Sequence, residues 1–180
     1  MNDVFGEAVA GCTGTLLVLD DDTHPPFGTS RRLVEHHGVD PTQLCIVQAD
    51  PTKAAAMKSD QQFGPQVVQD YVHLYLQKGE HNTPATHTHY AGMYLDLCGS
   101  WTGQLEPALQ AVLEVLRTTP TQPHQPFILG VTWCTRDAYG QPETVTLTEL
   151  QQLLMQSYPT QCIRHSLYGT MRTHFYKIMV

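Results

Sequence analysis

The stretch CIRHSLYGTMRTHFYKIMV, residues 162–180, differs in pattern from everything that precedes it. Cys162–Leu167 and Met171–Val180 both have the composition of strands, and three residues, Tyr-Gly-Thr, separate them. Because no helix fits into so short a connection, we expect the two runs to pair as an antiparallel hairpin. His165 and His174 fall on opposing strands of that hairpin, which predicts that they are cross-strand neighbours.

The chain upstream of the hairpin alternates between strand-like and helix-like runs. The apolar runs typical of strands are residues 13–20, 44–49, 66–69, 90–97 and 126–133. The helix-like segments that follow them are residues 30–38, 52–58, 70–79, 103–117 and 146–158. Such alternation is typical of a parallel sheet with right-handed crossovers. The sequence therefore predicts a three-layer, Rossmann-like α/β domain over residues 1–180, with a mostly parallel sheet of about seven strands and a C-terminal antiparallel hairpin.

Local signals mark the ends of the first predicted helix. Thr29 or Ser30 is expected to cap its N-terminus, and Gly38 is expected to end it. The helix over residues 103–117 has the clearest amphipathic spacing, with Leu105, Leu109, Val112, Leu113 and Leu116 on one face.

The composition excludes several classes of protein. The chain has 180 residues, of which 41% are hydrophobic and 15% charged, a balance that argues against disorder. The formal net charge of -7 does not indicate a nucleic-acid-binding surface. No apolar run approaches the length of a membrane span, and residues 1–11 lack the features of a signal peptide.

The cysteines indicate a reducing environment. They are Cys12, Cys45, Cys98, Cys134 and Cys162, an odd number without a C-x-x-C pair, and they lie in or directly beside strand-like runs. We expect buried, reduced thiols, and hence the cytoplasm or another reducing intracellular compartment.

Acidic residues stand at the ends of the predicted strands. Asp20, Asp50 and Asp70 come at or directly after the first, second and third strands. Ligands of open α/β sheets bind beyond the carboxyl ends of the strands, where the strand order reverses, so these three acids are expected to line one crevice. A carboxylate accepts paired hydrogen bonds from vicinal hydroxyls, which makes such an acid a candidate ligand for a nucleoside. Asp96 lies at the end of the fourth strand, where a charged residue favours a role in the site.

This succession of elements resembles that of the class I S-adenosylmethionine-dependent methyltransferases. The sheet of that family has seven strands, and its last strand runs antiparallel and is reached through a hairpin, which residues 162–180 match in pattern. The resemblance covers nearly the whole chain, and it rests on the order of the elements and the placement of the acids. It implies an enzyme that uses S-adenosylmethionine as its cofactor.

The resemblance also implies cofactor-binding residues. Asp20 fits the acid at the end of the family's first strand, and Asp21 and Gly28 lie in the turn that follows. In the family this turn is Gly-rich and holds the methionine part of the cofactor, whereas here it reads DDTHPPFG and the Gly-rich loop is degenerate. Asp50 fits the acid that bonds the ribose hydroxyls, and Asp70 fits the acid that often faces the adenine amino group.

The fourth strand leads into YLDLCGSW, residues 94–101, where the family usually carries its catalytic or substrate-facing motif. The resemblance implies that Asp96 is catalytic and that Cys98, Gly99 and Trp101 face the substrate. Methyl transfer needs little acid–base help, because the sulfonium is already an activated donor and positioning supplies most of the catalysis.

Structural interpretations compete with these assignments. Asp50 is followed by Pro51, and Asp-Pro also simply starts turns. Asp70 is equally typical of a helix cap, which is the interpretation that the residues favour. Cys98 is more typical of a buried thiol than of a nucleophile, and Trp101 fits stacking on a substrate and packing under a helix equally well.

Two clusters resemble metal sites. Asp20–Asp22 would need further oxygen ligands to hold a hard cation. His81, His87 and His89 have no cysteine at a usual zinc spacing, and histidines in loops are usually solvated. We therefore expect no metal site.

Three hypotheses about function follow. The first is a methyltransferase that acts on an unknown substrate. The second is a degenerate, non-catalytic Rossmann-like domain acting as a binding or scaffolding module, and it predicts that the side chains of Pro25, Pro26 and Phe27 fill the loop after the first strand. The third is a metal-dependent nucleotide-sugar transferase built on Asp20–Asp22. The sequence is compatible with a homo-oligomer or a fused partner domain and indicates neither a membrane nor a nucleic acid as partner.

Overall fold

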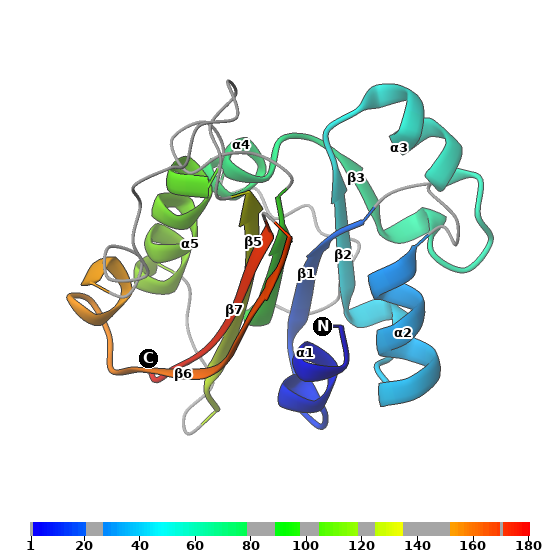
Figure 1. The fold of residues 1–180 in the computed structure, drawn as a ribbon. Helices are drawn as coiled ribbons and strands as arrows, with labels where there is room; N and C mark the ends of the chain where they lie inside the picture. The colour runs from blue at the N-terminus through cyan, green and yellow to red at the C-terminus, as the bar shows by residue number, and fades with distance from the viewer. Residues whose placement is uncertain are drawn as a thin grey trace.

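A seven-stranded sheet lies between two layers of helices in the computed structural model of the chain (Figure 1). The structure describes residues 2–20, 27–78, 89–97, 105–118, 125–134, 152–169 and 171–180. The strands are β1 (Thr15–Leu19), β2 (Leu44–Gln48), β3 (Val67–Gln69), β4 (Tyr90–Asp96), β5 (Phe127–Cys134), β6 (Thr160–Tyr168) and β7 (Met171–Ile178). Their order in the sheet is β3-β2-β1-β4-β5-β7-β6.

The strand directions confirm the predicted fold class. Strands β3, β2, β1, β4 and β5 run parallel to one another, and β7 is antiparallel to both β5 and β6. β1 is the middle one of the five parallel strands, and its Leu17 is in register with Cys45 of β2 on one side and with Met93 of β4 on the other. The order of the strands reverses between β1 and β4, which makes this the point where a ligand crevice is expected.

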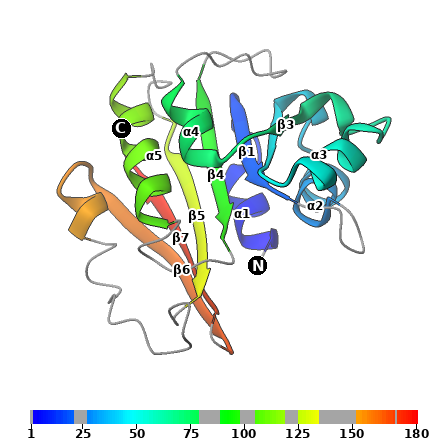
Figure 2. The same ribbon diagram turned by 90° about the horizontal axis from the view of Figure 1, so that it is seen from above.

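Helices cover both faces of the sheet (Figure 2). One face packs against α1 (Asn2–Val9), α2 (Gly28–His37) and α3 (Pro51–Lys58), and the other against α4 (Val72–Gln77) and α5 (Glu106–Thr118). Two short 3-10 helices, η1 (Pro41–Gln43) and η2 (Gly64–Gln66), precede β2 and β3. None of the helices within the described ranges is long and apolar enough to cross a bilayer.

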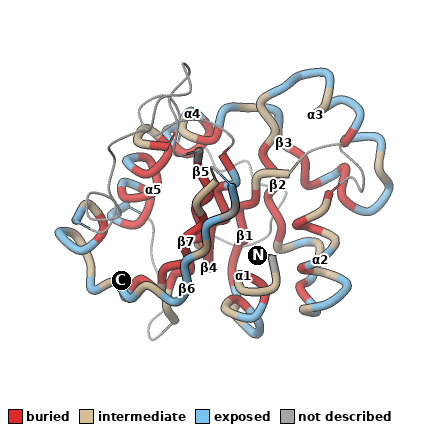
Figure 3. Tube along the Cα trace, viewed as in Figure 1, coloured by how far each residue is buried: buried red, intermediate tan, exposed pale blue. Residues whose placement is uncertain are grey.

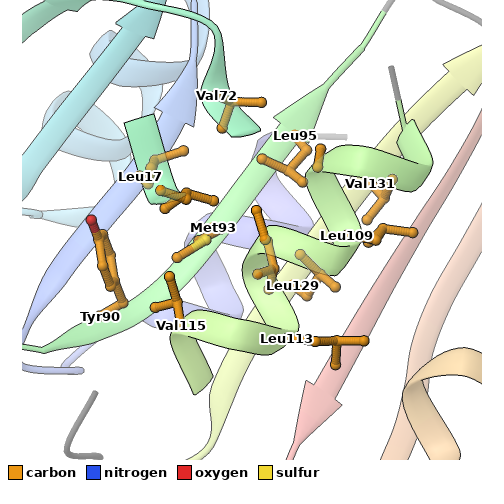
Figure 4. Close-up of a cluster of buried hydrophobic side chains, with 14 of the residues drawn as sticks. Leu17, Val72, Tyr90, Met93, Leu95, Leu109, Leu113, Val115, Leu129 and Val131 are labelled. Carbon is orange, nitrogen blue, oxygen red and sulfur yellow. The ribbon is translucent and has the colours of Figure 1, made fainter. Parts of the chain in front are cut away.

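Each face of the sheet has its own hydrophobic core. The central strands are buried along most of their length, whereas the outer faces of the helices are exposed (Figure 3). On one side, Leu109 and Val115 of α5 pack with Met93 and Leu129 of the sheet (Figure 4). Cys45 lies in this core, and burial raises the pKa of its thiol to about 11, while Cys12 and Cys162 are half-buried free thiols.

Helix α1 has no counterpart among the elements that the sequence predicts. Its Phe5 is fully buried and stacks on Tyr94 of β4 with 5.5 Å between the ring centroids. Its Asp3 accepts two hydrogen bonds from Arg32 of α2, at 2.6 and 2.7 Å, and lies 3.2 Å from Nε2 of His37. These contacts hold α1 against β4 and α2.

The ends of two helices differ from the prediction. α2 begins at Gly28 with Phe27 as its N-cap, so neither Thr29 nor Ser30 is the cap, although Gly38 ends the helix in the left-handed conformation as expected. α4 begins at Val72, and its N-cap is Tyr71, so the prediction of Asp70 as the cap is wrong. Of the helix expected over residues 146–158, the described part contains a helical turn at 152–155.

The C-terminal hairpin is confirmed. His165 and His174 are register partners, and their rings stack with 5.9 Å between centroids. Gly169 occupies the turn with a φ of 58°, a conformation that glycine adopts without strain. A register shift between Cys162 and Arg164 places one extra residue in the edge strand β6.

Candidate functional site

The carboxyl ends of the parallel strands bring four predicted site residues to one edge of the sheet. Asp20 follows β1, Asp50 lies two residues after β2, Asp70 follows β3 and Asp96 is the last residue of β4. Gly28 is a fifth described site residue, and the remaining ones, Asp21, Cys98, Gly99 and Trp101, lie outside the described residues, as do Pro25 and Pro26. The candidate site is therefore built here from the four acids and their neighbours.

The carboxylate of Asp20 is bonded to the N-terminus of α2. Its Oδ2 accepts hydrogen bonds from the backbone N–H and the hydroxyl of Ser30, both at 2.8 Å, and its Oδ1 accepts a longer one of 3.4 Å from the N–H of Thr29. The first N–H groups of a helix have no partner within the helix, and the helix dipole favours a negative charge beside them. Asp20 thus supplies from β1 the cap that the sequence analysis assigned to Thr29 or Ser30.

Phe27 enters α2 in a left-handed conformation, with φ 57° and ψ 42°. A phenylalanine rarely adopts this conformation, which costs about 1–2 kcal/mol. Its ring is buried in the core of the α1–α3 face and lies 5.1 Å from the ring of Phe63. Phe27 therefore packs in the core rather than in the loop that the binding-module hypothesis assigned to it.

Asp50 is the N-cap of α3. Its Oδ1 accepts hydrogen bonds from the N–H groups of Thr52 at 2.8 Å and Lys53 at 3.0 Å, and the residue is exposed. Within the described parts of the chain, its Oδ2 makes no hydrogen bond. Asp50 thus forms the local turn that Asp-Pro predicts, and its Oδ2 is left without a hydrogen bond among the described residues.

Gln48 joins the ends of β1 and β2, a role that the sequence analysis missed. Its side-chain amide donates to the backbone carbonyl of Asp20 at 2.9 Å, while its Oε1 accepts from the backbone N–H of Asp50 at 2.9 Å. Both partners are candidate site residues. The signal in the sequence was a polar residue that interrupts an apolar strand just before an acid.

Asp70 is held by its own neighbours. Oδ1 accepts a hydrogen bond from the N–H of Tyr71 at 2.8 Å, and Oδ2 forms an ion pair with Lys78, which lies just beyond the end of α4. The carboxylate is largely buried, with 14% of its side chain exposed. An adenine amino group would have to share this carboxylate with Lys78.

Asp96 is exposed at the end of β4, in register with Thr132 of β5. It lies two residues beyond Tyr94, so both side chains belong to the same face of the sheet. Burial raises the pKa of Tyr94, and the negative charges of Asp96 and Asp20 raise it further. The carboxylates on β1 and β4 therefore act on the same phenol from either side of the point where the strand order reverses.

Buried hydroxyl groups continue from Tyr94 across the sheet. The hydroxyl of Tyr94 lies 3.4 Å from Oγ1 of Thr132, which lies 2.9 Å from Oγ1 of Thr173 on β7. Polar groups inside a core are costly unless they pair with one another, and these three do so. These three hydroxyl groups connect β4, two residues before Asp96, with β7 of the C-terminal hairpin.

Gly28 is the first residue of α2, and a Cβ added to it would have no atom of the described residues within 4 Å. Its assignment to the cofactor site stays a prediction. The described residues contain no group of three or more side chains suited to a metal ion. His89 lies 3.1 Å from the carbonyl of Thr13, whereas His81, His87, Asp21 and Asp22 lie outside the described residues.

Comparison with known proteins finds matches in structure and none in sequence. No protein-family profile and no curated protein sequence matches the chain. HI0767 from Haemophilus influenzae, provisionally named a methylase, matches over 99% of this chain and 88% of its own, with a TM-score of 0.57 and 11% identity. The fold is that of the class I methyltransferases. In this chain, the seven strands and the antiparallel strand β7 of the C-terminal hairpin are the features expected of this class.

Two further matches have the same fold. YhhF from Escherichia coli, provisionally named a methyltransferase, covers 99% of this chain and 86% of its own with a TM-score of 0.52 and 11% identity. The match to CalS11, a TDP-rhamnose 3'-O-methyltransferase of calicheamicin biosynthesis, covers 98% of this chain and 77% of CalS11, with a TM-score of 0.51 and 17% identity. At these identities the comparison establishes the fold, and the function has to be argued from the site.

Proposed function

We propose that this protein is an S-adenosylmethionine-dependent methyltransferase that binds the ribose of its cofactor at Asp50. The observation that carries the proposal is the geometry of Asp50. The residue is exposed, its Oδ1 caps α3, and its Oδ2 has no hydrogen bond among the described residues, while Gln48 ties its backbone to the end of β1 beside the reversal of strand order. A ribose presents two adjacent hydroxyls, which an exposed carboxylate at this place can accept.

The residues at the site fit the nucleoside end of S-adenosylmethionine better than its amino-acid end. Asp50 is exposed and no atom of the described residues lies within 4 Å of a Cβ added to Gly28, whereas the carboxylate of Asp20 is already bonded to Thr29 and Ser30. When bound, the cofactor would supply the activated methyl group. The protein would position the acceptor beside it, with Asp96 facing the substrate and accepting a proton where the acceptor has to lose one.

Calorimetry with S-adenosylhomocysteine tests the proposal, because this product binds without turnover. We expect a Kd in the micromolar range for the wild type and a loss of at least tenfold for Asp50→Asn. Asparagine keeps an oxygen that can cap α3, so the helix stays in place while the charge is removed. Unchanged affinity in the variant would contradict the role of Asp50.

The chain contains a matched control for this substitution. Asp40-Pro41-Thr42 repeats the Asp-Pro-Thr sequence of residues 50–52, and Asp40 is also exposed and also caps a short helix, with 2.8 Å to the N–H of Thr42. Asp40 precedes β2 and so lies at the opposite edge of the sheet. Asp40→Asn should therefore leave ligand affinity unchanged.

The binding-module hypothesis remains the second candidate, and the closed Asp20 carboxylate favours it. In that case the fold would be kept without the cofactor. Neither heat of binding nor a thermal shift with S-adenosylhomocysteine would be observed. No methyl transfer would be detected in the wild type or in Asp96→Asn. A methyltransferase, in contrast, should lose turnover in Asp96→Asn and keep its affinity for S-adenosylhomocysteine.

A further inference from the structure

The described ends of the β1–α2 turn are bonded to each other. Asp20, at the entry, accepts hydrogen bonds from the backbone of Thr29 and from the backbone and hydroxyl of Ser30, at the exit. The amino-acid tail of an S-adenosyl compound carries a carboxylate and an ammonium group. A carboxylate binds best at the N–H groups of a helix N-terminus, yet here it would meet a carboxylate of the protein in that position.

The ammonium group of the tail gains little from Asp20 either. A carboxylate has about four sites for accepting hydrogen bonds, and three donors from α2 already use those of Asp20. The negative charge is also partly neutralised by the positive end of the helix dipole. An incoming ammonium group would therefore compete with the interactions that hold the start of α2.

The exit of the turn is also anchored. Phe27, the residue that precedes α2, is 2% exposed and packs on Phe63. To release the N-terminus of α2 from Asp20, the helix would have to move, and the Phe27 ring would have to leave the core. Arg31 of α2 adds to this anchor, because its guanidinium lies 5.4 Å from the centroid of the Phe63 ring and 3.3 Å from a carboxylate oxygen of Asp60.

The neighbouring strand end is open by comparison. Asp50 is exposed, and the α3 amides occupy one of its oxygens. Gln48 hydrogen-bonds to the backbone of both Asp20 and Asp50 and therefore ties the ends of β1 and β2 together. It thereby fixes the position of the exposed Asp50 carboxylate relative to the Asp20 carboxylate, which is already hydrogen-bonded. At the carboxyl edge of the sheet, Asp50 after β2 can therefore accept hydrogen bonds from a ligand, whereas the carboxylate of Asp20 after β1 is already used by α2.

We propose that the site recognises nucleoside thioethers by their nucleoside half and takes little binding energy from the amino-acid tail. This inference rests on the proposed function, and it narrows the chemistry of the ligand. The protein should bind 5'-methylthioadenosine, which has no amino-acid tail, almost as tightly as S-adenosylhomocysteine. An enzyme that grips both ends of its cofactor would discriminate strongly between the two compounds.

Calorimetric titration of the wild type with both compounds is the test. The expected result is two Kd values within about threefold of each other, both raised at least tenfold by Asp50→Asn and unaffected by Asp40→Asn. A preference of thirtyfold or more for S-adenosylhomocysteine would overturn the inference and leave the proposed function standing. Absence of binding for both compounds would overturn the two together.

A second variant tests the cause of the weak discrimination. Asp20→Ala removes the internal carboxylate and leaves the N–H groups of Thr29 and Ser30 available to the carboxylate of the tail. The ratio of the two Kd values should then shift at least fivefold in favour of S-adenosylhomocysteine, and the ratio is meaningful even where overall stability falls. Asp40→Ala, which removes a capping carboxylate at the opposite edge, should leave the ratio unchanged. An unchanged ratio in Asp20→Ala would contradict the assigned cause.

Discussion

At the scale of single residues, His174 is the most perturbed base in the described chain. It is 3% exposed, and its ring stacks with those of Trp133, His165 and Tyr176 at centroid distances of 5.0 to 6.0 Å. Among the described residues, its Nδ1 has no hydrogen-bond partner. Burial, and secondarily the charges of His165 and Arg172, lowers its pKa to about 4.

This shift predicts a dependence of stability on pH. The folded protein keeps His174 neutral, whereas the unfolded chain protonates it near pH 6.5, so its contribution is complete above that pH and is lost as the pH falls toward 4. A shift of this size corresponds to about 3 kcal/mol when fully realised, so we expect a loss of about 1–3 kcal/mol in the free energy of unfolding. Urea titrations between pH 7 and 4 measure it. His174→Phe should flatten the profile over this range, and the exposed His36→Gln should not.

Two glycines predict opposite effects of the same substitution. A Cβ on Gly130 would lie 2.7 Å from both the Tyr94 and the Phe175 rings, whereas a Cβ on Gly28 would meet no described atom within 4 Å. Gly130→Ala should therefore cost about 1–3 kcal/mol through overpacking, and Gly28→Ala should stabilise by up to about 1 kcal/mol through helix propensity. Thermal unfolding of the two variants distinguishes these outcomes. A tolerated Gly130→Ala would mean that the two rings move apart at little cost.

At the scale of elements, the helix ends at the acidic edge depend on residues from outside the helix. α2 is capped by Asp20 from β1, ten positions before Ser30, whereas α3 is capped locally by Asp50. A helix that is capped across a turn couples its N-terminus to the neighbouring strand. The stability of α2 is therefore linked to the same carboxylate that closes one half of the site.

Removing this cap should destabilise α2 in particular. We expect Asp20→Ala to lower the free energy of unfolding by about 1–2 kcal/mol, the usual cost of losing a charged N-cap. Asp20→Asn should recover part of this loss, because it keeps an acceptor. Hydrogen exchange measured by residue should show the increase at the N–H groups of Thr29 and Ser30 and not at those of α5. Uniformly faster exchange would argue against a local effect.

At the scale of the whole molecule, α1 completes the layer that covers β4 and β5. Phe5 fills the space over Tyr94, and Val9 is buried in the same core. The ion pair of Asp3 with Arg32 is exposed, and exposed ion pairs contribute little to stability because water screens them. The attachment of α1 therefore depends mainly on its apolar face.

Phe5→Ala tests this attachment. Truncation of a fully buried phenylalanine typically costs about 3–5 kcal/mol, a large part of the 5–15 kcal/mol by which an ordinary domain is stable. Arg32→Ala, which removes only an exposed ion pair, should cost far less than Phe5→Ala. Glu7→Ala, on the exposed side of the same helix, controls for helix propensity. Equal losses from Phe5→Ala and Arg32→Ala in urea unfolding would show that the ion pair and not the core holds α1.

Much of the fold could be predicted from local pattern. The alternation of strands and helices, the amphipathic α5 and the closing hairpin with His165 opposite His174 all follow from periodicity and turn length. The missed helix α1 has eight residues and is stabilised by tertiary contacts of Phe5 and Asp3. A helix this short is not stable on its own, so its formation depends on tertiary contacts and cannot be predicted reliably from the local sequence pattern.

The sequence by itself determined the class of fold. Continuous apolar runs such as residues 15–19 and 44–48 predict strands that are buried on both faces, as in a parallel sheet between layers of helices. It also indicated a turn at Asp50-Pro51, and that turn is local because Asp50 caps α3 through the N–H groups of residues 52 and 53. Only the tertiary structure decided that Asp20 binds Ser30, that Gln48 joins two strand ends and that Phe27 lies in the core. These contacts join residues separated by a turn or by a crossover. Such partners are chosen by the packing of neighbouring elements, which the periodicity of a single segment does not contain.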